Sequence, residues 1–238
     1  MSRGRGLAAA LVALLLAALA ATAATAPGAL ASSAAPRTAA EATAAASAEK
    51  PSIRWAPIPF PATRKREMRA YAKRHYGINT FQLKKPKVIV EHWTESSTWQ
   101  SAWDTFAPDV ADSELGEKPG VCAHFIVDEK GIIHQLVSIG TMCRHTVGLN
   151  YTAIGIEHVG FSDGEVLGNA KEMKASLALT CWLKDREGIA IKNVIGHNES
   201  LSSRYHKEKV ASLKDQTHDD FKRSSMNAYR DRLKDACG

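Results

Sequence analysis

Short apolar stretches alternate with segments of helical spacing along most of this 238-residue chain, and this alternation constrains its fold more than any other feature. Stretches rich in Val, Ile and Phe predict strands, at 87–91, 121–128, 132–137, 151–159 and 191–195. Apolar residues at helical spacing predict helices, at 63–76, 96–106, 169–186 and 219–236. The turn Glu129-Lys130-Gly131 predicts a β-hairpin between the second and third strands. We therefore expect an α/β fold with a central mixed β-sheet flanked by helices.

The first 31 residues predict a secretory signal peptide. Arg3 and Arg5 precede a run, from residue 7 to 26, of almost only Ala, Leu, Val and Thr, and Ala29-Leu30-Ala31 fits a signal peptidase site. A transmembrane anchor is the alternative, because the run nearly reaches the ~20 residues that a membrane span needs. The run is rich in Ala rather than in larger apolar residues, and no basic cluster follows it, so we expect cleavage after residue 31 and secretion.

Residues 32–50 are mostly Ala, Ser and Thr with almost no large apolar side chain, so we expect a flexible linker there. The folded domain is therefore expected at 51–238, which is long enough to bury one core. We expect a monomer that has no membrane span once the signal peptide is removed.

The chain carries 31 Lys and Arg against 25 Asp and Glu, a formal net charge of +6. Much of the positive charge falls in the predicted helix 63–76, where Met68, Tyr71 and Ala72 share one apolar face. A solvated helix that docks through this face explains the pattern better than nucleic acid binding does, so we expect no nucleic acid partner. An electrostatic role on an anionic cell envelope stays open.

The expected domain contains four cysteines, and an even number in an exported protein favours two disulfides. Sequence alone allows three pairings. We expect Cys122–Cys143, which would join neighbouring strands, and Cys181–Cys237, which would tie the last helix to the helix around Trp182. Free buried thiols are the alternative.

Nine histidines are many for this length, and the positions of three of them suggest a metal site. His92 follows the strand 87–91, His197 follows the strand 191–195, and His218 lies just before the last helix. Side chains at strand ends of an open α/β sheet gather into sites, and three protein ligands plus a water molecule are typical of catalytic zinc. The chain has no short ligand motif such as H-E-x-x-H, so spacing alone is a weak signal.

Five short motifs occur in a consistent order. They read HWT at 92–94, AHFIVDEKG at 123–131, RHTVG at 144–148, IGIE at 154–157 and IGHNE at 195–199. In this order and with these gaps the chain resembles the type-2 N-acetylmuramoyl-L-alanine amidases, which share a fold with the peptidoglycan recognition proteins. The resemblance covers about residues 86–221, most of the expected domain.

The resemblance implies a zinc ion bound by two histidines and a third Cys, Asp or His ligand. It also implies cleavage of the amide between the lactyl group of muramic acid and L-alanine. His92 and His197 match the two histidines. The third ligand of the family lies in a Lys-x-Asp or Lys-x-Cys element, where this chain reads Gln216-Thr217-His218, so His218 is the expected third ligand. His206, in a loop nine residues after His197, is the alternative.

Two catalytic residues are expected from the same resemblance. Glu157 matches the catalytic glutamate of one branch. We therefore expect Glu157 to act as general base toward a zinc-bound water nucleophile and then as general acid toward the leaving amine. Many members carry Tyr at the position of Ala123. This chain lacks that Tyr, as does the branch that relies on a catalytic Glu. Gln216 replaces a lysine that stabilises the oxyanion, so its hydrogen bond would act without charge. A solvated or ion-paired carboxylate is the alternative for Glu157.

Three further residues are expected to contact the substrate. Trp93 neighbours an expected ligand, and His145 matches an element that lines the substrate cleft of the family. His124 alternates with Phe125 on its predicted strand and is expected to support the site. A plain core histidine is the alternative for His124.

These expectations together predict a secreted, cell-wall-associated zinc hydrolase that cuts the N-acetylmuramoyl–L-alanine bond of peptidoglycan. Two other functions remain open. One is a module that binds peptidoglycan without cutting it, and the third ligand would decide this case. The other is a zinc peptidase that acts within the stem peptide, and the masses of the released fragments would decide that one.

Overall fold

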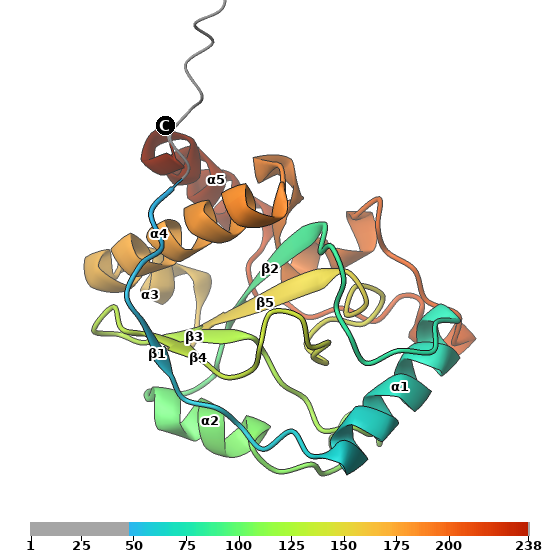
Figure 1. Ribbon diagram of the computed structural model, residues 1–238. Coiled ribbons are helices and arrows are strands. Elements are labelled where there is room, and N and C mark those ends of the chain that lie inside the picture. Colours follow the sequence, from blue (N-terminus) through green and yellow to red (C-terminus); the bar gives the residue numbers. More distant parts are fainter. Residues whose placement is uncertain (1–47, 238) are drawn as a thin grey trace, which may run out of the picture. The chain divides into compact units, whose positions relative to one another are not determined.

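Residues 48–237 are described by the structure, a computed structural model (Figure 1). The predicted signal peptide at 1–31 and most of the predicted linker at 32–50 lie outside the described residues. Within 48–237, none of the helices combines the length and the apolar character that crossing a membrane requires.

A six-stranded mixed sheet forms the centre of the described chain (Figure 1). Its strands are β1 (Ile53–Trp55), β2 (Val88–Trp93), β3 (Phe125–Val127), β4 (Ile133–Gln135), β5 (Ala153–His158) and β6 (Val194–Gly196). In space they follow the order β1-β4-β3-β5-β2-β6. The strands β3 and β4 pair antiparallel, as the hairpin pattern predicts, and the other neighbouring pairs of the sheet are parallel. The predicted mixed sheet is confirmed, and β1 is a strand that the pattern did not predict.

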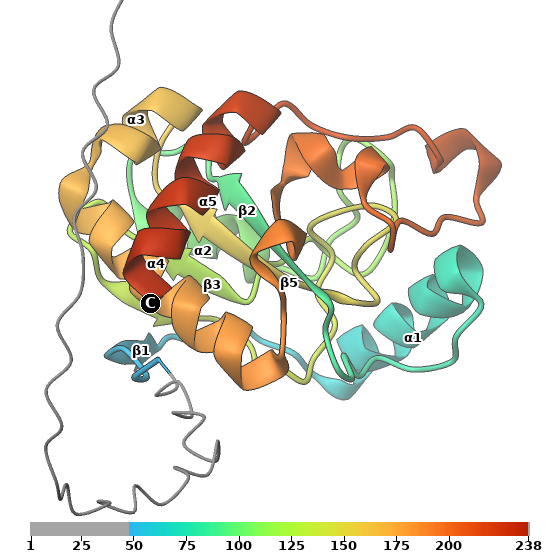
Figure 2. The ribbon, with the colours of Figure 1, turned by 90° about the horizontal axis from the view of Figure 1, so that it is seen from above.

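The described residues form five α-helices. They are α1 (Ala62–Tyr76), α2 (Trp99–Phe106), α3 (Asp163–Gly168), α4 (Ala170–Glu187) and α5 (Arg223–Cys237). Figure 1 shows α4 and α5 on one face of the sheet and α2 on the opposite face, and Figure 2 shows α4 and α5 packed along each other. Met68, Tyr71 and Ala72 of α1 are fully buried, so the predicted docking face of this helix is confirmed.

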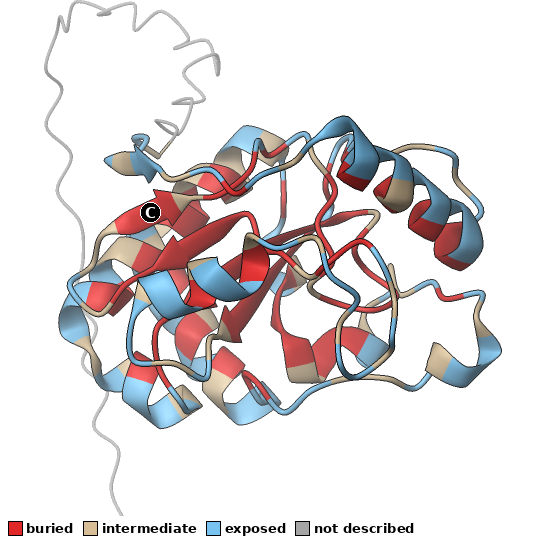
Figure 3. Cartoon of the chain, turned by 90° about the horizontal axis from the view of Figure 1, so that it is seen from below, coloured by how far each residue is buried: buried red, intermediate tan, exposed pale blue. Residues whose placement is uncertain are grey.

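The central strands β2 and β5 are buried on both faces of the sheet (Figure 3). The larger cluster of buried side chains includes Ile89 of β2, Leu179 of α4 and Met226 of α5. A smaller cluster includes Ile126 of β3 and Phe106 of α2. Burial on both faces explains why the central strands read as continuous apolar runs rather than as alternating ones.

Both expected disulfides are present in the structure. Cys181 of α4 and Cys237 at the end of α5 have Cα atoms 5.4 Å apart and tie the two helices together, as expected. Cys122 and Cys143 have Cα atoms 5.2 Å apart, but they join the segments before β3 and after β4 rather than two strands.

Candidate active site

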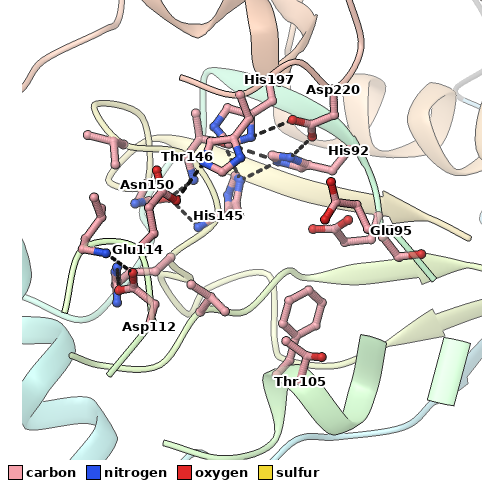
Figure 4. A pocket seen from close by; sticks show the side chains of 18 of the residues that line it. His92, Glu95, Thr105, Asp112, Glu114, His145, Thr146, Asn150, His197 and Asp220 are labelled. Carbon is pink, nitrogen blue, oxygen red and sulfur yellow. Dashed lines mark hydrogen bonds and ion pairs between the residues drawn. The ribbon is translucent and has the colours of Figure 1, made fainter. Parts of the chain in front are cut away.

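The carboxyl ends of β2, β5 and β6 meet at one edge of the sheet, because β2 runs parallel to both of its neighbours. His92 of β2 lies opposite Glu157 of β5, and His197 directly follows β6. A cavity of about 460 Å³ opens at this edge (Figure 4). Its walls come from these strand ends, from α2 and from three loop segments, at 112–115, 144–150 and 216–220.

His92, His197 and Asp220 form a compact group on one wall of this cavity (Figure 4). The carboxylate of Asp220 contacts both rings, with Oδ2 2.8 Å from Nδ1 of His92 and Oδ1 3.2 Å from Nδ1 of His197. One possible ligand atom from each residue lies within 4.8 Å of the others, and all three residues are buried. Two imidazole nitrogens and a carboxylate oxygen are a donor set that zinc accepts, with a fourth position for water or substrate. The group therefore fits a catalytic metal ion.

The electrostatics of the group favour the ligating protonation states of Asp220 and His197, whereas they favour the protonated form of His92. Burial alone would raise the pKa of Asp220, but hydrogen bonds and charge from His197 and His92 hold this pKa well below its usual range. Burial lowers the pKa of His197 to about 4, against the opposing effect of the hydrogen bond that its ring donates to Asp220. Burial also acts to lower the pKa of His92, but the carboxylates of Glu157 and Asp220 outweigh it, so that the pKa is raised. A metal ion bound to His92 would therefore displace a proton.

Gly196 explains how Asp220 reaches the end of β6. A Cβ atom at position 196 would lie 1.9 Å from the carbonyl oxygen of Phe221 and 2.6 Å from its Cβ atom. Glycine therefore lets the segment 220–221 pack directly on the strand end, where the backbone N–H of Asn198 donates to the carbonyl of Asp220 at 2.8 Å. The Gly-His pair thus supplies one member of the group and makes room for another.

His145 fixes the orientation of His92. Nε2 of His145 lies 3.4 Å from the carbonyl oxygen of Ala153, which can only accept, so Nε2 carries the hydrogen and Nδ1 accepts. Nδ1 of His145 lies 2.9 Å from Oγ1 of Thr146 and 3.1 Å from Nε2 of His92, and both of these atoms can donate to it. A hydrogen bond from Nε2 of His92 leaves Nδ1 of that ring, which faces Asp220, for a metal ion. The ring of His145 packs against Gly155, where a Cβ atom would lie 2.7 Å from it. Burial lowers the pKa of His145 well below its ordinary value, so the ring stays neutral.

Glu157 lines the cavity beside this group, and the residue is only 8% exposed. Burial raises the pKa of Glu157 to about 7; the charge of His92 opposes this shift, and the carboxylates of Asp220 and Glu95 add to it. This pKa results from burial and from neighbouring charges, since none of the described residues donates a hydrogen bond to Glu157. A buried carboxylate with a pKa near neutrality and no fixed partner is suited to exchange protons with a reacting molecule.

The structure places Asp220, rather than the expected His218, with the two histidines. His218 is exposed, its ring stacks on His197 with centroids 4.7 Å apart, and its Nε2 lies 3.1 Å from Oε2 of Glu114. The arrangement favours Asp220 over the expected His218 as third member of the group, for a geometric reason. The backbone bond at Asp220 sets that residue against β6, whereas His218 comes two residues earlier and lies at the rim of the cavity.

Gln216 lines the cavity, but its amide already has a partner. Its Nε2 donates to Oε1 of Glu114 at 3.2 Å, so a bond to a reacting oxygen would have to replace this one. The alternative ligand His206 lies outside the group, since its ring packs against Gly148, where a Cβ atom would lie 2.2 Å from Nε2.

Trp93 and His145 line the cavity, as expected, whereas His124 does not. Nδ1 of His124 accepts from the backbone N–H of Gly155 at 3.0 Å, and its Nε2 donates to the carbonyl of Thr141 at 2.9 Å. His124 is fully buried and both ring nitrogens are used inside the protein, so the expectation that it contacts substrate is corrected. Trp93 is held by a bond from its Nε1 to Asp163 at 2.9 Å.

Asp220 is the site residue that the sequence reasoning missed, although a signal for it exists. The stretch His218-Asp219-Asp220 has the spacing of the Lys-x-Asp element if His218 is placed on the lysine. Asn150 was also missed. Its Oδ1 accepts from the backbone N–H groups of His145 at 2.9 Å and of Thr146 at 2.7 Å. These two bonds hold the loop that carries His145 beside the candidate metal ligands.

The fold and the site define an α/β protein with a candidate metal site at the carboxyl edge of a mixed sheet. The model of the N-acetylmuramoyl-L-alanine amidase family matches residues 82–220, more than half of the chain. The chain belongs to this family of amidases, which act on peptidoglycan.

Solved amidase structures are similar to this chain at low identity. The endolysin amidase LysCS from Clostridium intestinale is 19% identical over 64% of this chain and 84% of its own, with a TM-score of 0.45. A mutant endolysin from Bacillus subtilis is 22% identical over 79% of this chain and 99% of its own, with a TM-score of 0.43. The amidase AmiD from E. coli, in complex with anhydro-N-acetylmuramic acid-L-Ala-D-gamma-Glu-L-Lys, is 24% identical over 49% of each chain, with a TM-score of 0.38. A search of curated proteins found no match.

Proposed function

We propose that this protein is a secreted zinc-dependent hydrolase that cleaves the amide bond between N-acetylmuramic acid and L-alanine in peptidoglycan. The observation that carries the proposal is the convergence of His92, His197 and Asp220 beside the buried Glu157 in one cavity. Membership of the amidase family supplies the substrate class.

His92 and His197 would hold zinc through their Nδ1 atoms, and Asp220 would hold it through a carboxylate oxygen. When bound, zinc would supply a Lewis acid for the amide carbonyl and lower the pKa of a water molecule to about 7. His145 would keep the ring of His92 in the ligating tautomer through the 3.1 Å contact described above.

Glu157 would act first as general base and then as general acid. Its carboxylate would take a proton from the attacking water and then deliver it to the nitrogen of L-alanine. The C–N bond breaks and a C–O bond forms, so the products are the lactyl carboxylate of muramic acid and a stem peptide with a free amine. Burial of Glu157 keeps its carboxylate out of competing bonds with bulk water.

Gln216 would donate a hydrogen bond to the oxyanion once substrate enters. This step requires the amide to exchange Glu114, its present partner, for the reacting oxygen. The donor carries no charge, so its contribution to catalysis would be smaller than that of a lysine.

Export to the cell wall is part of the proposal. The signal-peptide pattern at 1–31 supports it, and so do the two disulfides, because disulfides persist in oxidising compartments outside the cytosol. We further propose that the enzyme acts on the wall as a monomer.

The test is incubation of the purified, zinc-loaded protein with cell walls and mass analysis of the released fragments, with Glu157→Gln as the control. The proposal expects intact stem peptides with a free L-alanine amine from wild type and almost none from the control. Shorter peptides would identify a peptidase instead, and binding without any release would identify a binding module. Either result overturns the proposal.

A further inference from the structure

A cluster of polar side chains is buried on the face of the sheet that α4 and α5 cover (Figure 1). Its members are fully buried and come from two strands and two helices: Glu91 of β2, His158 of β5, Ser176 and Thr180 of α4, and Tyr229 of α5. Polar groups cost free energy on burial unless they are hydrogen-bonded, and fully bonded ones make a core rigid. A departure from an apolar core is expected where a functional site must be held in one position.

The cluster lies directly behind the candidate active site. Successive side chains of a strand point to opposite faces of the sheet. His92 and Glu157 are paired in neighbouring strands and both line the cavity. Glu91 and His158, their neighbours in sequence, therefore point toward α4 and α5. Each of the two site residues on these strands thus has a buried polar neighbour on the other face of the sheet.

His158 connects this cluster to His92. Nδ1 of the His158 ring lies 2.8 Å from the backbone carbonyl oxygen of His92. A carbonyl oxygen can only accept, so Nδ1 carries a hydrogen and donates it. Nε2 of the same ring lies 2.7 Å from Oγ of Ser176. Both ring nitrogens are therefore used, and one of the two bonds ends on the backbone of a candidate metal ligand.

The helices fix the far end of this ring. Oγ of Ser176 lies 2.7 Å from the hydroxyl oxygen of Tyr229, which lies 3.0 Å from Oγ1 of Thr180. Thr180 donates in turn to Glu91 of β2 at 3.1 Å. The position of the His158 ring is thus set by buried groups of α4 and α5 and not by the loops around the cavity.

The ring of His158 also touches the segment that carries the third candidate ligand. It packs edge-on against the ring of Phe221, with centroids 5.5 Å apart and an interplanar angle of 76°. Phe221 directly follows Asp220. One buried ring therefore contacts the backbone of His92 and the residue after Asp220, and it directly follows Glu157 in the chain.

We propose that His158 is a positioning residue that fixes the backbone of His92 at the end of β2, so that the ring of His92 is held in place for the metal ion and beside Glu157. The inference rests on the proposed function and adds to it a residue that does not line the cavity. A ligand ring moves with its own backbone, and residues that support a metal ligand typically change metal affinity or activity by about 10- to 100-fold.

The test compares two substitutions of similar shape. His158→Asn keeps an N–H donor near the position of Nδ1, so a bond to the carbonyl of His92 remains available, whereas His158→Leu has no donor. His134→Leu is the matched control. His134 of β4 is also buried, its Nε2 lies 3.0 Å from Oδ2 of Asp128, and it does not line the cavity. The control therefore loses a buried histidine away from the site.

Zinc affinity is measured on metal-free protein by competition with a chromophoric chelator, and kcat and KM are measured with a defined muropeptide at saturating zinc. His158→Leu should bind zinc about 10- to 100-fold more weakly and should lose kcat in the same range. Its KM should stay that of wild type, because the side chain does not line the cavity. His158→Asn should recover most of both losses. His134→Leu should be less stable than wild type in denaturant but should keep its zinc affinity and kcat.

A folded His158→Leu with the zinc affinity and kcat of wild type would overturn the inference. It would also be overturned if His158→Asn were no better than His158→Leu, or if the control lost as much. If His158→Leu does not fold, Ser176→Ala decides, because it releases only the far end of the ring and should also weaken zinc binding; wild-type affinity in this variant would overturn the inference. If wild type binds zinc but cleaves no muropeptide, the proposed function fails, and the zinc titration still decides the role of His158.

Discussion

Replacing Gly196 by Ala should disrupt the candidate metal site while the rest of the fold stays intact. The added Cβ would lie 1.9 Å from the carbonyl oxygen of Phe221, and protein Cβ atoms essentially never approach another atom closer than 3.0 Å. The segment that carries Asp220 must therefore retreat by at least 3.0 − 1.9 = 1.1 Å. Ligand distances in metal sites vary by only about 0.2 Å, so a shift of this size removes Asp220 from the coordination shell.

We expect Gly196→Ala to weaken zinc binding by more than about 100-fold, since the loss of residues that merely support a ligand already costs 10- to 100-fold. The assay is a competition titration of zinc against a chromophoric chelator, with the circular dichroism spectrum as a check on folding. Overpacking should also lower the free energy of unfolding by about 1–3 kcal/mol, which leaves the fold intact if the protein has ordinary stability.

Gly164→Ala is the matched control, because a Cβ atom at this position in α3 meets nothing within 4 Å. It should bind zinc as wild type does and should be slightly more stable, since alanine favours a helix over glycine. The reasoning is refuted if Gly196→Ala is folded and binds zinc with the affinity of the control.

Three further predictions concern catalysis, pH and the disulfides. Glu157→Gln should lower kcat by about 10²–10⁴ while the protein still binds zinc, measured with a defined muropeptide; unchanged kcat would remove Glu157 from the mechanism. Burial raises the pKa of Glu91 to about 8. Between pH 4.5 and 8 the unfolded chain ionises while folded Glu91 stays neutral, so wild type loses stability as pH rises through this window. Glu91→Gln should match wild type near pH 4 and unfold with a free energy higher by on the order of 5 kcal/mol at pH 8, measured on metal-free protein in denaturant; parallel pH profiles would contradict this. Replacing both Cys181 and Cys237 by Ser should cost about 4 kcal/mol of unfolding free energy, given a sequence separation of 56 residues; no change in the denaturation midpoint would contradict it.

Spacing and turn chemistry made most of the fold predictable. The helix α4 follows from its apolar spacing, and the hairpin of β3 and β4 follows from a turn in which Gly131 takes a φ of 79°. The strand β1 (Ile53–Trp55) was not predictable, because three residues at the edge of the sheet carry too little pattern to distinguish a strand from a loop.

The site was predictable only where local sequence determines the position of a side chain. His92 and His197 come at strand ends, and parallel strands bring such ends together. The choice between His218 and Asp220 depends on how closely the chain approaches Gly196, which is a contact between segments and not a spacing. The prediction for His124 was limited in the same way. Its alternation with Phe125 does not reveal that both of its ring nitrogens bond to backbone groups.

The central claim is that His92, His197 and Asp220 bind one zinc ion beside Glu157. Anomalous diffraction from crystals of the zinc-loaded protein, with data collected on both sides of the zinc absorption edge, tests this claim most directly. The account predicts one peak about 2.0–2.1 Å from Nδ1 of each histidine and about 2.0–2.2 Å from an oxygen of Asp220. A peak bound by His218 in place of Asp220, or no peak at this edge of the sheet, would contradict it.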